Sequence, residues 1–168
     1  GKLDEIRLYD RILSTTEAAN LYRLTTPTGV DTSLKGYWSF NGQDTTSTIA
    51  YDRSGVGNDG TLTGGPPVVE GRVGQALSFD NVNDYVLAGS PAAVDDLETQ
   101  GGGGLTASAW IYPESGGTFG GVIVGKRAAP SPGGGDWALT MHQDGDAIKF
   151  FKSYSTTSLE ATTLPGSI

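Results

Sequence analysis

Short apolar runs separated by glycine-rich turns make up most of the chain after residue 35, and this punctuation limits the fold more than any other feature. The 26 glycines among 168 residues are about twice the usual share, and without the period of collagen they are assigned to turns. Asp144-Gly145, between the last two runs, favours a tight hairpin turn. Regularly spaced short strands predict an all-β fold, an antiparallel β-sandwich or jelly roll. The runs lie at residues 36–40, 76–79, 84–87, 105–112, 122–124, 137–141 and 147–151.

The N-terminal residues 2–9 predict a further strand. Its apolar positions Leu3, Ile6 and Leu8 partly follow a period of two. The adjacent acids Asp4 and Glu5 interrupt that alternation. We therefore expect a strand with a local irregularity at the acidic pair.

A short helix is expected next, from about residue 15 to residue 24. Ser14 and Glu17 have the spacing of a capping box, and Ala18, Leu21 and Tyr22 follow at helical spacing. Residues 26–34 then carry a proline and a glycine among threonines, which predicts a linker.

The order of these segments is unusual, because a strand and a capped helix come first and a new β-rich run then begins without a matching close. The ends of the chain are therefore out of phase with the folding unit. The N-terminal strand can find its partners in its own polypeptide, in a neighbouring copy or in a permuted arrangement, and the sequence leaves all three open. An unfinished sheet would leave edge strands that attract a partner.

Composition excludes some classes of partner. The formal net charge of −8 argues against nucleic acid, whose phosphates require a basic groove, and fits calcium or a neutral polymer better. No apolar run approaches the roughly 20 residues that cross a bilayer, so membrane insertion is not expected. The absence of cysteine excludes disulfides and thiolate metal sites, and suits a cytosolic protein or a bacterial or archaeal surface protein that uses calcium instead.

Several motifs together resemble a known family. Residues 36–41, 52–60, 74–86 and 105–111 resemble, in this order, the first half of a laminin-G-like domain of the concanavalin A-like lectin/glucanase superfamily. Residues 3–17 resemble the closing strand and terminal helix of the same family.

The resemblance implies three segments: the end of one unit at 1–25, a linker at 26–34, and the first part of the next unit at 35–168. It further implies a jelly roll of two antiparallel sheets, an extracellular or cell-surface location, and a role in adhesion or glycan binding. Because a strand pair of a complete member is missing, the chain looks like the tail of one repeat joined to the front of the next, as in a tandem array.

The resemblance also points to a structural calcium ion at Asp4. Calcium takes six to eight oxygen ligands, and glycine-rich loops expose carbonyl groups readily. Further ligands could come from the loops at Asp52, Asn58, Asp59 and Asp80. The alternative is that these loop side chains cap turns through their own hydrogen bonds.

Glycan binding would require exposed aromatic rings, and the candidates are Tyr112, Phe119, Trp137 and Tyr154. Trp38 and Trp110 lie in alternating strands and are expected in the core. The same interpretation is open for Trp137.

Catalysis has little support in the sequence. A glycosidase requires two carboxylates about 5–10 Å apart across the bond, and no run supplies the glutamate–aspartate–glutamate alternation of the superfamily's glucanases. We therefore expect a non-catalytic, calcium-stabilised module for adhesion or glycan recognition, with carbohydrate as its partner. The alternative is a homopolymer, in which copies complete one another's sheets to build an extracellular filament or sheath.

Overall fold

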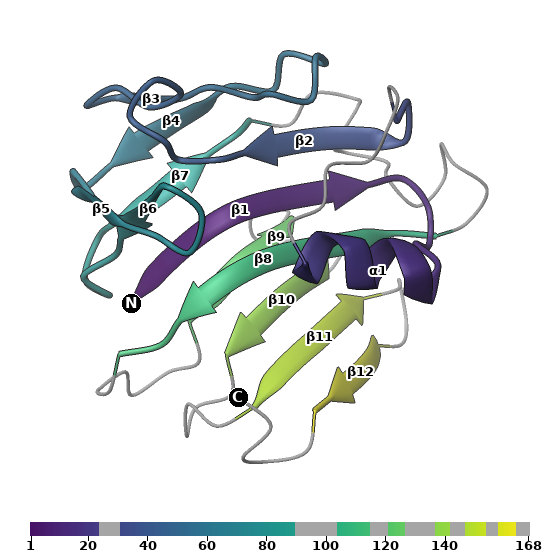
Figure 1. Cartoon of the computed structure of the whole chain (residues 1–168). Helices are drawn as coiled ribbons and strands as arrows, with labels where there is room; N and C mark the ends of the chain where they lie inside the picture. The colour runs from purple at the N-terminus through teal and green to yellow at the C-terminus, as the bar shows by residue number, and fades with distance from the viewer. Residues whose placement is uncertain are drawn as a thin grey trace.

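The computed structural model describes residues 1–23, 31–89, 104–114, 121–126, 137–141, 147–153 and 158–163. In these ranges the chain is an all-β sandwich with one helix, as the sequence predicted (Figure 1). Jelly-roll connectivity stays a prediction. The elements are β1 Lys2–Tyr9, α1 Thr15–Tyr22, β2 Leu34–Trp38, β3 Ile49–Ala50, β4 Gly60–Thr63, β5 Val68–Glu70, β6 Gln75–Ser78, β7 Tyr85–Leu87, β8 Thr106–Tyr112, β9 Val122–Lys126, β10 Trp137–Met141, β11 Ile148–Ser153 and β12 Ser158–Thr162.

The described strands form three antiparallel sheets. The first contains β2, β1, β6 and β5 in that order, with β8 also paired to β1. The second has the order β12-β11-β10-β9, and the third the order β3-β4-β7. The sequence pattern does not predict β3, β4, β5 and β12, which are short or lack a clear alternation.

Strand β1 lies in the interior of the first sheet and takes all its described partners from its own chain. β8 pairs with it from Lys2 to Tyr9. The other edge is shared, because β6 pairs with residues 2–3 and β2 with residues 6–9. The N-terminal segment therefore completes the sheet of its own chain.

The expected irregularity at the acidic pair is confirmed. The register between β1 and β8 shifts between Asp4 and Arg7, and Glu5 has a φ of 55°. A glutamate at positive φ is uncommon and costs backbone energy. The buried carboxylate of Glu5 offsets that cost, since it accepts a hydrogen bond from the Tyr37 hydroxyl at 2.9 Å and pairs with Arg7.

Helix α1 begins with the expected capping box. The Ser14 hydroxyl accepts the Glu17 amide at 3.3 Å, while the Glu17 carboxylate accepts the Ser14 amide at 2.8 Å. The helix ends at Tyr22, two residues before the expected end, where Arg23 serves as its C-cap. None of its residues is buried.

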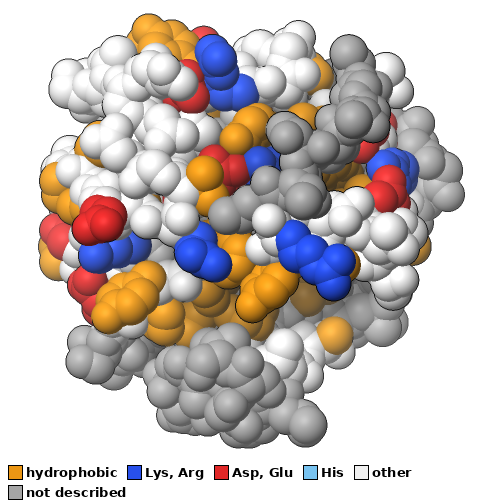
Figure 2. Space-filling model, in the orientation of Figure 1, with side chains coloured by type: hydrophobic (Ala, Val, Ile, Leu, Met, Phe, Trp, Pro, Cys, Tyr) orange, Lys and Arg blue, Asp and Glu red, His pale blue; other side chains and the backbone are white. Residues whose placement is uncertain are grey.

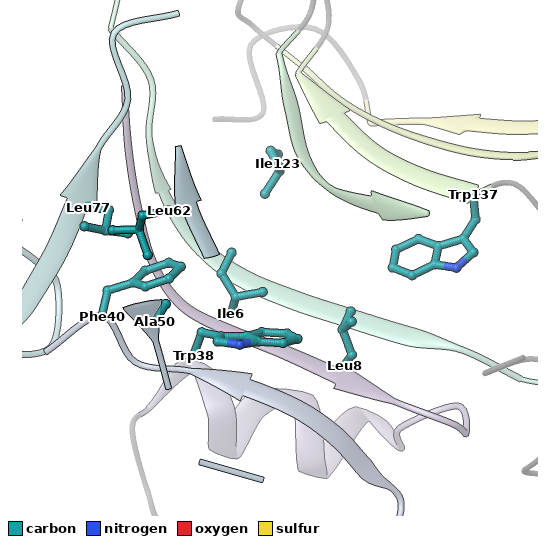
Figure 3. Packing of buried hydrophobic residues seen from close by; sticks show 9 residues of the cluster. All are labelled: Ile6, Leu8, Trp38, Phe40, Ala50, Leu62, Leu77, Ile123 and Trp137. Atoms are coloured by element: carbon teal, nitrogen blue, oxygen red, sulfur yellow. The ribbon is translucent and has the colours of Figure 1, made fainter. Parts of the chain in front are cut away.

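The core draws on all three sheets (Figure 3). In Figure 3 the Trp137 ring points from β10 toward the sheet that carries Leu8. The indole nitrogen of Trp38 donates to the Asn58 carbonyl at 3.1 Å. The buried cluster consists of Ile6, Leu8, Trp38, Phe40, Ala50, Leu62, Leu77, Ile123 and Trp137.

Trp110 departs from the expectation of a core residue. Side chains alternate along β8, and Ala107, Ala109 and Ile111 pack against the core. Trp110 therefore lies on the outer face of the sheet, where its half-buried ring packs against Tyr22 of α1 with 5.4 Å between centroids. The expectation that Trp110 lies in the core was wrong. At this position the outer face of the sheet is also covered, by Tyr22 of α1, so a large apolar side chain can lie there.

Candidate functional site

A groove of about 250 Å³ lies on the outer face of the first sheet. It runs between the end of β8 and the turn that joins β5 to β6, across the start of β1. Its lining combines two aromatic rings, two cations and two carboxylates. The residues that supply them are Trp110, Tyr112, Lys2, Arg72, Asp4 and Glu70.

Strand pairing explains why these side chains meet. Trp110 and Tyr112 are two residues apart on β8 and therefore share a face. Across the ladder, Asp4 pairs with Trp110 and Lys2 pairs with Tyr112. Four groove residues are thus placed by the β1–β8 register alone.

Each cation lies over one aromatic ring. The Lys2 ammonium is 5.3 Å from the centroid of Tyr112, and the Arg72 guanidinium is 5.1 Å from that of Trp110. In Figure 2, Lys and Arg side chains lie beside exposed hydrophobic ones toward the lower left, where β1 begins and β8 ends in Figure 1. Cation–π attraction orients both positive charges beside the groove.

Asp4 lies beneath this surface and is only 3% exposed. Its Oδ2 accepts the Val73 amide at 2.8 Å, whereas its Oδ1 is buried without a hydrogen-bond partner. Burial raises the pKa of this carboxyl above its ordinary value, because desolvation disfavours the charged form. A donor that reached Oδ1 would satisfy the one oxygen of this carboxylate that the fold leaves without a partner.

The turn that carries Arg72 is held in place by side chains around it. Asp4 binds its Val73 amide, and the Asn41 side chain accepts the Gln75 amide at 2.9 Å. Gly71 fits against Asp4 only because it lacks a side chain, since an added Cβ would lie 2.7 Å from Asp4 Oδ2. Asp4 therefore positions the turn as well as lining the groove.

The predicted loop ligands act as turn acceptors. The Asp52 carboxylate accepts the amides of Tyr37 and Asn58 at 2.9 Å and that of Ser54 at 2.8 Å. Asp59 accepts the Asp52 amide at 2.8 Å. These contacts match the capping alternative.

Asn58 and Asp80 are engaged in the same way. The Asn58 side chain donates to the Lys35 carbonyl at 2.6 Å. Asp80 accepts the Val82 amide at 2.9 Å, and such backbone donors lower its pKa. Within the described ranges, no three Asp, Glu or His side chains come together as a metal cluster. Calcium stays a prediction from the resemblance.

The aromatic residues predicted to bind a sugar lie in different surroundings. Tyr112 lies in the groove and is 63% exposed. Trp137 is a core residue with 3% exposure, so its ring offers no face to a sugar, which corrects its selection as a ligand residue. Tyr154 and Phe119 lie outside the described residues.

Lys2, Arg72 and Glu70 were not predicted from the sequence as groove residues. Alternation along β8 could have put Trp110 beside Tyr112, but no local signal indicates that the β5–β6 turn lies next to them.

Comparison of the chain with protein-family models, curated proteins and solved structures finds no match. Among the described helices, none is long and apolar enough to span a bilayer.

Proposed function

We propose that this chain is a non-catalytic carbohydrate-binding module of an extracellular or cell-surface protein, with the groove beside β8 as its binding site. One observation carries the proposal: the groove combines an exposed aromatic ring with a buried, unpartnered carboxylate oxygen. The resemblance to laminin-G-like domains supports the same class of function, including a role in adhesion.

Tyr112 supplies the apolar surface. Sugars present C–H faces that pack on aromatic rings, and an oriented ring loses little conformational entropy on binding. The Lys2 ammonium and the β-ladder restrict the orientation of Tyr112 before any ligand arrives.

Asp4 supplies the directional contact. A sugar hydroxyl that donates to Oδ1 would satisfy an acceptor that is otherwise desolvated without compensation. Glu70, at the other side of the groove, offers a second, exposed acceptor. Hydroxyl donors with an apolar face are the chemistry of a saccharide.

The rival proposal of a filament or sheath rests on strands that lack partners. The N-terminal strand that motivated it is paired on both edges within its own chain. For this reason the groove, rather than sheet completion between copies, carries our proposal. The proposal also does not require calcium.

A glycan array followed by calorimetric titration of the best ligand tests the proposal. Replacement Tyr112→Ala should weaken binding at least about tenfold, as expected for a central aromatic contact. Tyr85→Ala is the matched control, because Tyr85 is a 51% exposed tyrosine on β7 outside the groove. Equal losses in both variants, or no binding to any glycan, would contradict the proposed site.

The bound saccharide should be recovered intact after incubation. Hydrolysis that disappears in Asp4→Asn or Glu70→Gln would replace the non-catalytic proposal by a glycosidase, since the two carboxylates line one groove.

A further inference from the structure

We infer that the saccharide bound in the groove is anionic, with its carboxylate or sulfate group held by Arg72 and Lys2. This inference rests on the proposed function and adds the chemical class of the ligand.

The pairing of charges on the molecule favours an anionic ligand. The chain carries 19 acidic and 11 basic residues, so a cation on its surface has an excess of carboxylates available. Arg7, Arg11, Lys35, Arg53 and Lys149 each form an ion pair with at least one of them. Lys2 and Arg72, like the exposed Arg23, form no ion pair with any described carboxylate. Lys2 and Arg72 instead lie over aromatic rings that line the groove.

The positions of Lys2 and Arg72 favour the same kind of ligand. Both cations border the surface that the proposal gives to the sugar ring, because their partner rings, Trp110 and Tyr112, are two positions apart on one strand face. A guanidinium offers a fork of donors that matches a carboxylate or a sulfate, and the ammonium adds a second charge. An anionic substituent on a sugar packed against Tyr112 would lie within reach of this pair.

The two acids of the groove do not cancel this preference. Asp4 is buried, with Oδ2 bound to the turn and Oδ1 without a partner, so it offers an acceptor to a hydroxyl donor. Glu70 is exposed, so water screens its charge. The groove thus offers separate contacts for a hydroxyl, a sugar face and an anion.

Two pairs of probes test the inference by calorimetric titration. Polygalacturonate is compared with its fully methyl-esterified form, which keeps the backbone and loses the charge. Dextran sulfate is compared with dextran. We expect at least one charged polymer to bind about tenfold more tightly than its neutral counterpart, and the pair that shows the difference identifies carboxylate or sulfate.

The variants assign the effect to the groove. Arg72→Gln and Lys2→Gln should each remove most of the preference for the charged polymer. Lys149→Gln makes the same change in net charge on β11, outside the groove, and should leave the preference within about twofold of the original. Unchanged thermal midpoints would show that all three variants are folded.

The outcomes separate this inference from the proposed function. Equal binding of charged and neutral polymers that is lost in Tyr112→Ala keeps the module and rejects the anionic ligand. A preference weakened as much by Lys149→Gln as by Arg72→Gln would reflect overall charge and also rejects it. If neither charged polymer binds while the protein binds a neutral glycan of the array, the anionic ligand is rejected and the module is kept. No binding to any polymer or any glycan of the array rejects the proposed function itself.

Discussion

Asp4 and Glu5 are adjacent in the sequence and equally buried, at 3% exposure, yet their carboxylates have different surroundings. Glu5 is matched by Arg7 and by the hydroxyl of Tyr37. Burial, together with the Glu5 charge and its hydrogen bond, raises the pKa of Tyr37 to about 12. Asp4 has a backbone donor on one oxygen and none on the other. Asp4 is therefore the residue whose charge opposes folding.

Asp4→Asn should show this as a pH-dependent difference in the free energy of unfolding. The folded-state pKa of Asp4 lies above its ordinary value of 3.8, so the folded chain holds this proton to higher pH than the unfolded chain. The original protein should lose stability relative to Asp4→Asn as pH rises from about 4 through the raised pKa. Urea denaturation over a pH series measures the difference.

Asp80→Asn is the control, and its effect on the free energy of unfolding should change with pH in the opposite direction. Backbone donors lower the pKa of Asp80, so its contribution is present above 3.8 and disappears as pH falls through the lowered value. If the stability difference between the original protein and the variant changed with pH in the same direction for Asp4→Asn and Asp80→Asn, the burial argument for Asp4 would be contradicted.

Asp52→Ala tests whether this loop residue supports turns or binds metal. The change removes the acceptor for three backbone amides, including that of Tyr37 in β2. We expect a loss of about 2–3 kcal/mol in the free energy of unfolding, because the donors lose their partner. The loss should be the same with calcium and with a chelator, and a loss confined to calcium-containing buffer would restore Asp52 as a ligand.

Among the elements, α1 depends on contacts at its N-terminal end. It buries no side chain, and Arg11 joins Glu17 at 2.6 Å to Asp31 at 2.9 Å. These ion pairs and the capping box hold the helix, while Tyr22 rests on Trp110 at its other end. A helix held in this way should respond strongly to the loss of its cap.

Ser14→Ala should lower the free energy of unfolding by about 1 kcal/mol, the usual effect of losing an N-cap hydroxyl. Thr16→Ala, an exposed change in the first turn of the same helix, serves as the control and should have little effect. Chemical denaturation followed by tryptophan fluorescence measures both. If the control falls as far as Ser14→Ala, the capping box has no special role.

On the scale of the whole molecule, the central place of β1 decides how the sheet is completed. β8 covers one edge of β1, while β6 and β2 divide the other at the Asp4–Glu5 irregularity. A strand with this many partners is as much a part of the core as any later strand. Neighbouring copies are not required to complete this part of the sheet.

The midpoint of thermal unfolding should therefore not depend on protein concentration. Calorimetry over a hundredfold range of dilution, roughly, is sufficient, because a folded state made by association loses stability on dilution. Light scattering provides the mass of the folded species. A midpoint that falls with dilution would show that strands are exchanged between copies and would favour the filament proposal.

The sequence by itself determined the local features of this protein. Alternation predicted most of the strands, the spacing of Ser14 and Glu17 predicted the start of α1, and the adjacent acids predicted the irregularity in β1. These features depend on neighbours within a few residues, so the pattern contains the necessary information.

Only the tertiary structure decided which strands border β1, that Trp110 faces outward, and that Arg72 lies beside residues of β1 and β8. It also placed the predicted loop ligands in turns and left an oxygen of Asp4 without a partner. These outcomes depend on contacts between segments up to a hundred residues apart, roughly, and no local pattern specifies such contacts.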